Sequence, residues 1–148
     1  AWHQPTQEPW PTIGALVNSN RRLIVFTDDS DGGPEWMHDV WEHAFETSFS
    51  VKAPDQLSCD PNRGDVTHAL FILNHFLSTP YADPSGASEI NTYDAVHARA
   101  LECWGVHQRR PNFVTVDFVS TGDVMAAVDD LNELAQPRDR TERQAPRR

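Results

Sequence analysis

The chain has 148 residues, 39% of them hydrophobic, and a formal net charge of −10. Its length is sufficient for one domain with a buried core, and its negative charge argues against a nucleic-acid-binding surface, which requires clustered basic residues. No apolar run approaches the roughly 20 residues of a membrane-spanning helix. We therefore expect a globular domain.

Apolar patterning in the first third of the chain predicts a helix, a strand and a second helix. Residues 10–20 place apolar side chains at helical spacing after Thr12, a favourable N-cap residue. Residues 21–27 contain a continuous apolar run, the pattern of a strand buried on both faces. Pro34 stands at a helix-start position, and an apolar stripe follows it over residues 34–45. The stripe consists of Met37, Val40, Trp41 and Ala44.

The rest of the chain continues this alternation. Residues 47–51 are a short strand candidate, and continuous apolar runs predict buried strands over residues 69–77 and 112–119. Helices are expected over residues 91–107 and 122–134. Their expected N-caps are Asn91 or Thr92 and Thr121, and loops rich in Pro, Asp and Gly are expected at 53–66 and 78–88.

Unbroken apolar strands separated by helices are typical of parallel βα units, so the sequence predicts an α/β fold. Residues 1–9 form a polar lead-in, and residues 10–135 form the folded region. Residues 136–148 are rich in Arg and have no large apolar side chain, which predicts a disordered basic tail.

Polar or ionisable residues lie at the carboxyl end of each strong strand. Asp28 and Asp29 follow the first, Asn74 and His75 lie near the end of the second, and Asp117 lies near the end of the third. In parallel α/β folds, active sites are built at this edge because the loops there converge. We therefore expect these side chains to line a common mouth.

Each candidate has a structural alternative. Asp28 and Asp29 are also suited to opening a turn before Gly32 and Gly33. His75 fits a hydrogen-bonded core histidine as well as a functional one. Asp117 favours a site role, since the apolar run resumes after it and a buried carboxylate is costly unless paired.

Other motifs are weaker. Arg63 is suited to phosphate contact, although an exposed loop arginine is the default. His38 and His43 are five residues apart, which does not fit an HExxH zinc motif. Cys59 and Cys103 fit no metal-binding spacing; a disulfide of an exported protein and two separate buried thiols both remain open.

Five segments, taken together, point to a family. They are "WPTIGALVNSNRRLIVFTDD", "PEWMHDVWEHAFETSFS", "SCDPNRG", "ALFILNHFLSTP" and "PNFVTVDFVSTGDVMAAVDDLN". Their order and spacing, over roughly residues 9–135, resemble the C-terminal half of the phosphatidylinositol-specific phospholipase C-like phosphodiesterases.

The resemblance implies a TIM-type (β/α) barrel that cleaves phosphodiesters, typically of inositol phospholipids. In that family two histidines act as general base and general acid, an arginine stabilises the phosphate charge, and a carboxylate near the last strand orients a catalytic histidine. The resemblance assigns this carboxylate to Asp117 and places Asp28 and Asp29 at the substrate-facing mouth. Arg63, Asn74 and His75 are the other candidate substrate-binding residues.

The family's two catalytic histidines lie in the first half of the barrel, which these segments do not include. A complete barrel needs about 250 residues and eight βα units. We therefore expect a fragment, the C-terminal half of the barrel, that is inactive alone and needs the missing N-terminal half as its partner.

Two other functions remain open. One is a non-enzymatic module that binds a phosphate-bearing ligand or a partner chain, and the other is a metal-dependent hydrolase using Asp28, Asp29 and Asp117 around Ca²⁺ or Mg²⁺. The resemblance favours chemistry without a metal or other cofactor. It also implies lipid metabolism, a phospholipid substrate, contact with a membrane surface and an extracellular location.

Overall fold

The computed structural model of the chain describes residues 2–5, 8–29, 33–78 and 84–135. The predicted tail and part of the predicted loop 78–88 lie outside these residues. The helices are α1 (Ile13–Asn18), α2 (Pro84–Ile90), α3 (Tyr93–His107) and α4 (Val124–Ala135). The strands are β1 (Val25–Thr27), β2 (Met37–Asp39), β3 (Ala44–Thr47), β4 (Pro61–Gly64), β5 (Leu70–Asn74) and β6 (Phe113–Thr115), with short 3-10 helices η1 (Val40–Glu42) and η2 (Pro54–Gln56).

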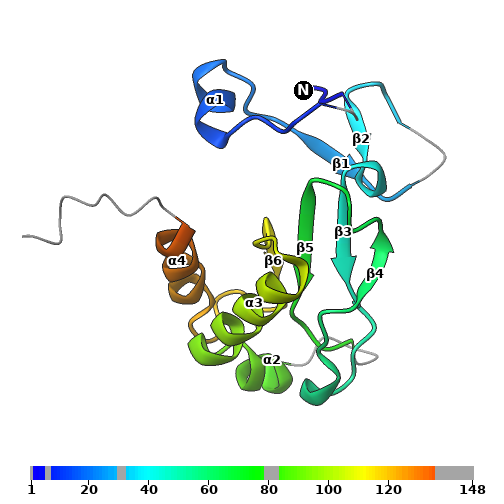
Figure 1. The fold of residues 1–148 in the computed structure, drawn as a ribbon. Helices are drawn as coiled ribbons and strands as arrows, with labels where there is room; N and C mark the ends of the chain where they lie inside the picture. The colour runs from blue at the N-terminus through cyan, green and yellow to red at the C-terminus, as the bar shows by residue number, and fades with distance from the viewer. Residues whose placement is uncertain (1, 6–7, 30–32, 79–83, 136–148) are drawn as a thin grey trace, which may run out of the picture.

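The described strands form two sheets. The larger has the order β4-β3-β5-β6, in which β3, β5 and β6 are parallel and β4 is antiparallel to β3. β1 and β2 form a separate parallel pair, which lies with α1 beyond the amino ends of β3 and β5 (Figure 1). The predicted α/β class is confirmed, with parallel and mixed sheets.

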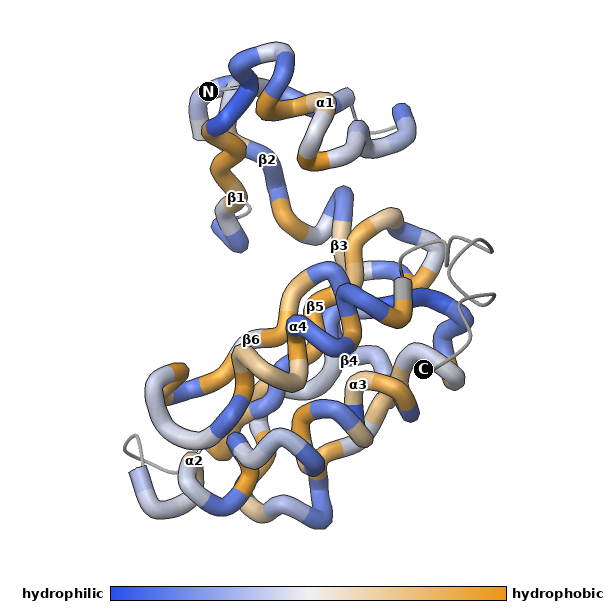
Figure 2. The backbone as a smooth tube through the Cα atoms, turned by 90° about the vertical axis from the view of Figure 1, so that its left-hand side faces the viewer, coloured by the Kyte–Doolittle hydropathy of each residue, from blue (hydrophilic) through white to orange (hydrophobic). Residues whose placement is uncertain are grey.

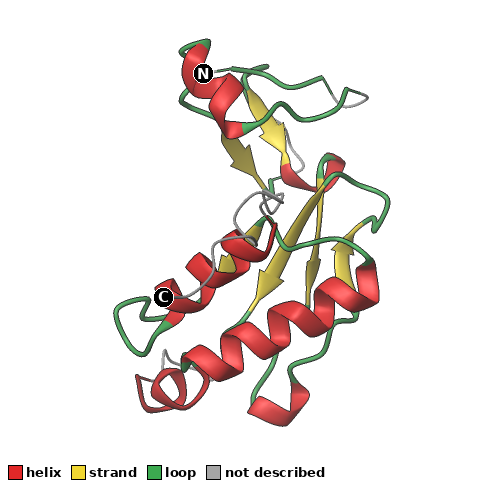
Figure 3. Cartoon of the chain, turned by 60° about the vertical axis from the view of Figure 1, so that its left-hand side comes forward, coloured by secondary structure: helices red, strands yellow, loops and turns green. Residues whose placement is uncertain are grey.

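Helices α3 and α4 lie on one side of the larger sheet (Figures 1 and 3). The core between these helices and the sheet centres on Phe45 of β3 and Phe71 of β5, whose rings stack with centroids 4.5 Å apart. The other buried apolar residues of the two clusters on this face are Leu73, Val96, Ala100, Cys103, Val124, Ala127 and Leu131. Apolar side chains at i, i+3 and i+4 on α3 and α4 explain why these helices pack here.

A disulfide joins Cys59, in the segment before β4, to Cys103 of α3. Their Cα atoms are 5.1 Å apart, and the bond closes a loop with a sequence separation of 44. A cross-link over a loop of this length stabilises a fold by about 3–4 kcal/mol in the chain-entropy model. Of the two alternatives for Cys59 and Cys103, a disulfide and two separate buried thiols, the structure has the disulfide.

The opposite face of the sheet is apolar near its amino ends. A pocket of about 220 Å³ is lined there by Phe26, Val40 and five residues of the larger sheet. Those five are Ala44, Leu70, Ile72, Phe113 and Thr115. Figure 2 shows the hydrophobic stretches at β1, β5 and β6 that contribute to this region. No described helix is long and apolar enough to cross a membrane.

The helix expected over residues 34–45 is wrong. This segment contains β2, η1 and the start of β3 instead. His38 is buried against Trp10 and Phe26, with ring centroids 5.9 and 5.3 Å away, and Asp39 caps η1 by accepting a hydrogen bond from the Trp41 N–H. Contacts with residues distant in the sequence thus override the helical periodicity.

Several expected strands are shorter or displaced. The run at 21–27 forms only the three residues of β1, which are half-buried, and Leu23 is 59% exposed, so this strand is not buried on both faces. The strand expected at 47–51 shares only Thr47 with β3, which ends there, and residues 48–51 form no strand. The strand expected at 112–119 ends at Thr115.

Some of the other predicted element boundaries are confirmed, and others are wrong. Thr12 caps α1 as expected, β5 lies within 69–77, and α3 follows the Thr92 cap. The loop expected at 53–66 contains β4 and η2, and that at 78–88 contains the start of α2. Thr121 is not the cap of α4, because the Ala127 N–H bonds to the Asp123 carbonyl.

Two glycines provide a matched test of this packing. Gly64 has φ 76°, and a Cβ there would overlap the Ala44 carbonyl and lie 2.8 Å from the Phe45 Cα. A Cβ at Gly105, within α3, would meet no atom within 4 Å. We expect Gly64→Ala to lower the free energy of unfolding by about 2–4 kcal/mol and Gly105→Ala to raise it by about 0.5–1 kcal/mol. Urea unfolding followed by tryptophan fluorescence measures both; equal effects would contradict the described β4 backbone.

Candidate functional site

A row of hydrogen-bonded polar side chains crosses the larger sheet, with Glu46 at its centre. Arg63 Nε donates to Glu46 Oε1 over 2.6 Å, and Asn74 Nδ2 donates to Glu46 Oε2 over 2.8 Å. Asn62 Nδ2 also donates to Glu46 Oε1, over 3.3 Å. Thr115 Oγ1 donates to Asn74 Oδ1 over 2.6 Å. The row therefore connects all four strands of the sheet.

Strand alternation explains the location of this row. Successive residues of a strand point to opposite faces, so Phe45 enters the core beneath the helices while Glu46 faces the other side. Asn74 pairs with Thr115 across β5 and β6, which brings their side chains together on that same face. Because β3, β5 and β6 are parallel, their carboxyl ends meet at one edge of the sheet. The predicted placement of Asn74 at such an edge is found.

Glu46 is the most buried member of the row, with a side chain only 5% exposed. A buried carboxylate requires a cation and hydrogen-bond donors to offset its loss of hydration. Arg63 supplies the charge, and the amide groups of Asn62 and Asn74 supply further hydrogen bonds. Glu46 thus fixes the orientation of three side chains.

Arg63 remains accessible although it is paired. Its side chain is 40% exposed, and its guanidinium lies 4.2 Å from the ring centroid of Trp41 and 4.5 Å from that of Phe49. Arg63 Nη1 also lies 3.6 Å from Asp28 Oδ2, an ion pair in which Asp28 is 70% exposed. The two rings and Glu46 hold the guanidinium in place, while its exposed part can meet an anion.

His75 lies on the other face of the sheet from Asn74. It is 1% exposed; its Nε2 donates to the Ile90 carbonyl over 2.9 Å, and its Nδ1 accepts from Arg99 Nη1 over 3.4 Å. Burial lowers the pKa of His75, and the nearby Arg99 charge lowers it further, against the effect of the Ile90 hydrogen bond. This placement separates His75 from the polar row and matches the core-histidine alternative.

Asp117 lies beyond the end of β6 and is half-buried, not enclosed in an apolar strand, since Phe118 and Val119 are 38% and 56% exposed. Its backbone carbonyl accepts a hydrogen bond from Asn91 Nδ2 over 2.8 Å. Among the described residues, its carboxylate has no hydrogen-bond partner. Asp117 therefore stands at the same edge as Thr115, positioned by Asn91 and not joined to the row.

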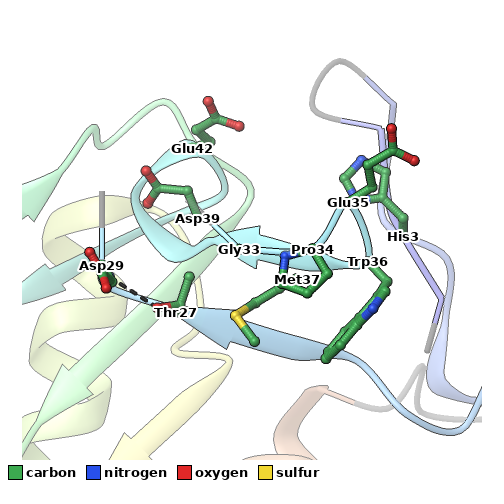
Figure 4. A pocket seen from close by; sticks show the side chains of 10 residues that line it. All are labelled: His3, Thr27, Asp29, Gly33, Pro34, Glu35, Trp36, Met37, Asp39 and Glu42. Carbon is green, nitrogen blue, oxygen red and sulfur yellow. Dashed lines mark hydrogen bonds between the residues drawn. The ribbon is translucent and has the colours of Figure 1, made fainter. Parts of the chain in front are cut away.

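Asp29 lines a different region. A pocket of about 730 Å³ extends along the β1–β2 pair and the segment before β2, and four carboxylates line it (Figure 4). They are those of Asp29, Glu35, Asp39 and Glu42. Because β1 pairs with β2 and not with the larger sheet, Asp28 reaches the polar row only through Arg63, and Asp29 does not reach it. The common mouth expected at the ends of three strands is therefore not formed by the described residues, because β1 belongs to a separate sheet beyond the amino ends of β3 and β5 (Figure 1).

In the part of the chain that the structure describes, no group of three or more His, Cys, Asp or Glu side chains is arranged to hold a metal ion. Asp28, Asp29 and Asp117 do not converge on one point. Asp28 faces Arg63, Asp29 lines the acidic pocket, and Asp117 lies near α2.

Glu46, Thr115 and Asn91 are not among the residues that the sequence predicts to line a site. Glu46 was hidden because the preceding segment was assigned to a helix. The segment "AFET" shows no apolar-polar alternation, so it carries no period-2 signal for a strand. Thr115 has the composition of an ordinary strand residue, and Asn91 that of a helix cap, so neither carried a separate signal.

The fold and the site define an α/β protein whose parallel strands end in a polar row with an accessible arginine. The family model described as PI-PLC X 1 matches residues 3–132. The chain therefore belongs to the PI-PLC X family, which confirms the relationship to phosphatidylinositol-specific phospholipases C that the five segments predicted.

Curated relatives support this assignment. PI-PLC X domain-containing protein 1 of Arthroderma benhamiae is 30% identical over 139 residues, which cover 84% of this chain and 45% of that protein. A PI-PLC X domain-containing protein of Arabidopsis thaliana is 26% identical over 141 residues, covering 88% and 32%. An uncharacterized secreted protein of Arthroderma benhamiae is 23% identical over 145 residues, covering 85% and 33%.

The chain thus spans between a third and a half of the length of these relatives. No solved structure matches it.

The buried histidines predict a pH dependence of stability. Burial lowers the pKa of His75 and of His43, which lies beside His38. The unfolded chain therefore takes up protons near pH 6.5, where the folded chain does not, and the free energy of unfolding falls as the pH drops below about 6.5, by up to about 1.4 kcal/mol per pH unit for each histidine. Urea unfolding at pH 7.5, 6.5 and 5.5 measures this slope. His43→Phe should reduce the slope by one proton, and stability that is constant over this range would contradict the prediction.

Proposed function

We propose that this chain is the C-terminal half of a TIM-type barrel in a phosphodiesterase that cleaves phospholipids, with Arg63 as the group that meets the phosphate. The observation that carries the proposal is the polar row at the carboxyl ends of the parallel strands. It holds an accessible guanidinium in a fixed orientation. Membership of the PI-PLC X family supports the same reaction class.

The two faces of the larger sheet support a half barrel. One face is covered by α3 and α4 (Figure 3). The other is apolar near the amino ends and polar at the carboxyl ends, which is the pattern of a TIM-barrel interior with its site at the carboxyl end. The missing N-terminal half would add the strands that close the barrel around this face.

In the proposed mechanism, the exposed guanidinium of Arg63 stabilises negative charge that develops on the phosphate oxygens. Glu46 keeps that guanidinium in place, and Asn74 fixes Glu46 from the other side. Asp28 and Asp29 provide carboxylate oxygens at the rim, which can accept hydrogen bonds from substrate hydroxyl groups. Asp117, whose carboxylate is unpaired among the described residues, is the candidate to orient an incoming catalytic histidine.

The general base and general acid would come from the missing half. A positioned base activates a hydroxyl group next to the phosphate, and a positioned acid protonates the leaving oxygen. His38, His43 and His75 are buried, which makes these three histidines unsuited to such roles. The chain alone is therefore expected to be inactive.

The proposal includes an extracellular location and contact with a phospholipid surface. The Cys59–Cys103 disulfide is typical of exported proteins, and one relative is named a secreted protein. We propose chemistry without a metal, because Arg63 already provides the cation that the phosphate needs.

The coding sequence upstream of Ala1 tests the half-barrel proposal. We expect it to encode further βα units, including two strands that each carry a histidine at the carboxyl end. When the 148-residue chain is produced alone, its uncovered sheet edge should cause self-association, measurable by sedimentation. Monomeric, cooperative unfolding of this chain, together with no such histidines upstream, would contradict the proposal and favour a phosphate-binding module.

Variants of the whole protein test the assigned roles. Arg63→Gln should lower kcat/KM for vesicles containing phosphatidylinositol by about 10²–10³-fold, because one charge-stabilising group is lost. Asp117→Asn should lower kcat far more than it lowers the free energy of unfolding. Arg110→Gln, which removes a half-buried arginine with a solvent-exposed hydrogen bond to Asn132, is the matched control and should change neither.

A chelator belongs in the same assay. Activity that is unchanged by it is the expected result, and its loss would favour the metal-dependent alternative. Equal activity of Arg63→Gln and the Arg110→Gln control would reject the role of Arg63, and equal losses of turnover and stability in Asp117→Asn would return Asp117 to a structural role.

A further inference from the structure

One face of α3 contacts the segment before β4 at three successive turns. Arg99 Nη2 donates to the Ser58 carbonyl over 2.8 Å, Cys103 is bonded to Cys59, and His107 Nε2 donates to the Cys59 carbonyl over 2.7 Å. The three helix residues are four positions apart, so they lie along one stripe of the helix. We call Arg99, Cys103 and His107 the α3 clamp.

The α3 clamp holds the segment that leads into β4, an edge strand. β4 is at the edge of the sheet and pairs with β3 alone, with an irregular register between Phe45 and Thr47. Three of its four residues are exposed; the exception is Arg63. Much of β4 therefore faces solvent, and an exposed edge strand opens locally at a lower free-energy cost than a strand of the core.

Cys59 is close to Arg63 along the chain. Four residues of extended chain span at most about 14 Å, and the antiparallel pairing of Pro61 with Thr47 sets the direction of the strand that follows. A fixed Cys59 therefore restricts where the Arg63 side chain can reach. Release of Cys59 would allow β4 to slide or separate, and the 2.6 Å contact of Arg63 Nε with Glu46 depends on that placement.

Arg99 is an unusual group to bury for stability alone. It is 7% exposed, its Nε has no hydrogen-bond partner in the described structure, and burial lowers its pKa to about 10. No carboxylate forms an ion pair with it among the described residues. Its guanidinium instead donates to two carbonyls, those of Asn74 over 2.6 Å and Ser58 over 2.8 Å.

This pair of contacts ties the end of β5 to the segment before β4. Asn74 contacts Glu46 from one side through its side chain, and Arg63 contacts Glu46 from the other. Arg99 therefore holds, from behind the sheet, two of the backbone segments that supply the polar row.

We propose that Arg99, Cys103 and His107 are positioning residues that keep Arg63 oriented toward the phosphate site, and that reduction of the disulfide releases this orientation. The inference rests on the proposed function only for its effect on activity. The redox step is an exchange with a dithiol: two electrons pass to the Cys59–Cys103 bond, both sulfurs gain a proton, and the dithiol closes to a cyclic disulfide.

A nuclear magnetic resonance experiment follows Arg63 directly. The Arg63 Nε–H proton, held by Glu46, should give a slowly exchanging signal in the ¹⁵N-labelled protein, identified by its absence in Arg63→Lys. Dithiol treatment should broaden or remove this signal while the backbone amide signals of Phe71–Leu73, in the core strand, remain. The same change is expected in the double variant Cys59→Ser, Cys103→Ser, to which dithiol should add nothing.

A second pair of variants keeps the test decisive if loss of the disulfide unfolds the chain. His107→Leu removes the donor to the Cys59 carbonyl but keeps apolar packing against Phe45 and Phe71, whose rings lie 5.0 and 5.1 Å away. It should weaken the Arg63 signal, and His107→Gln, which retains a donor, should restore it. An unchanged Arg63 signal both in His107→Leu and after reduction, in a protein that stays folded, would overturn the proposal.

Activity provides an independent readout in the whole protein. Reduction or His107→Leu should lower kcat/KM for phosphatidylinositol vesicles at least tenfold, with little change in Tm for His107→Leu. If the oxidised whole protein shows no hydrolysis at all, the proposed function fails while the Arg63 signal still tests the clamp. If hydrolysis is present and insensitive to loss of the Arg63 signal, the positioning role fails and the proposed function stands.

Discussion

The burial of one carboxylate, that of Glu46, constrains the whole carboxyl edge of the larger sheet. A charge removed from water is tolerated only where donors surround it, and here the donors come from both neighbouring strands: Arg63 and Asn62 on β4 and Asn74 on β5. Glu46 therefore requires the edge strand β4 to lie against β3, although the register between these two strands is irregular. The arrangement of the site and the topology of the sheet depend on each other.

The two faces of the sheet hold polar groups in different kinds of hydrogen bond. The helix-covered face contains the aromatic core and the disulfide, and it also contains His75 and Arg99, polar groups that bond mainly to backbone carbonyls. The other face presents Glu46, Asn74 and Thr115, whose side chains bond mainly to one another. Asn74 joins the two systems, since its backbone carbonyl accepts from Arg99 while its side chain contacts Glu46.

Much of this arrangement could be predicted from the sequence, and the exceptions have physical causes. The position of Asn74 at a strand end could be predicted, because a strand end appears in the sequence as a break in an apolar run. Its neighbour His75 shows that the position along a strand does not tell which face of the sheet a side chain occupies. Glu46 was missed because residues 34–45 have helical periodicity, and only distant aromatic side chains, those around His38, decide against the helix. Pairing partners of short strands cannot be read from one segment alone, so the separate sheet of β1 was not foreseen.

The adjacent carboxylates at the end of β1, those of Asp28 and Asp29, determine the electrostatic potential around them. Asp28 is compensated by Arg63, whereas its neighbour contributes to a hollow lined by four acidic groups. Arg63 is paired with Glu46 as well, so one guanidinium faces two carboxylates, and both sides of the end of β1 carry excess negative charge. The field around the end of β1 therefore favours cations and repels free anions, and only direct contact with the guanidinium of Arg63 would offset that repulsion.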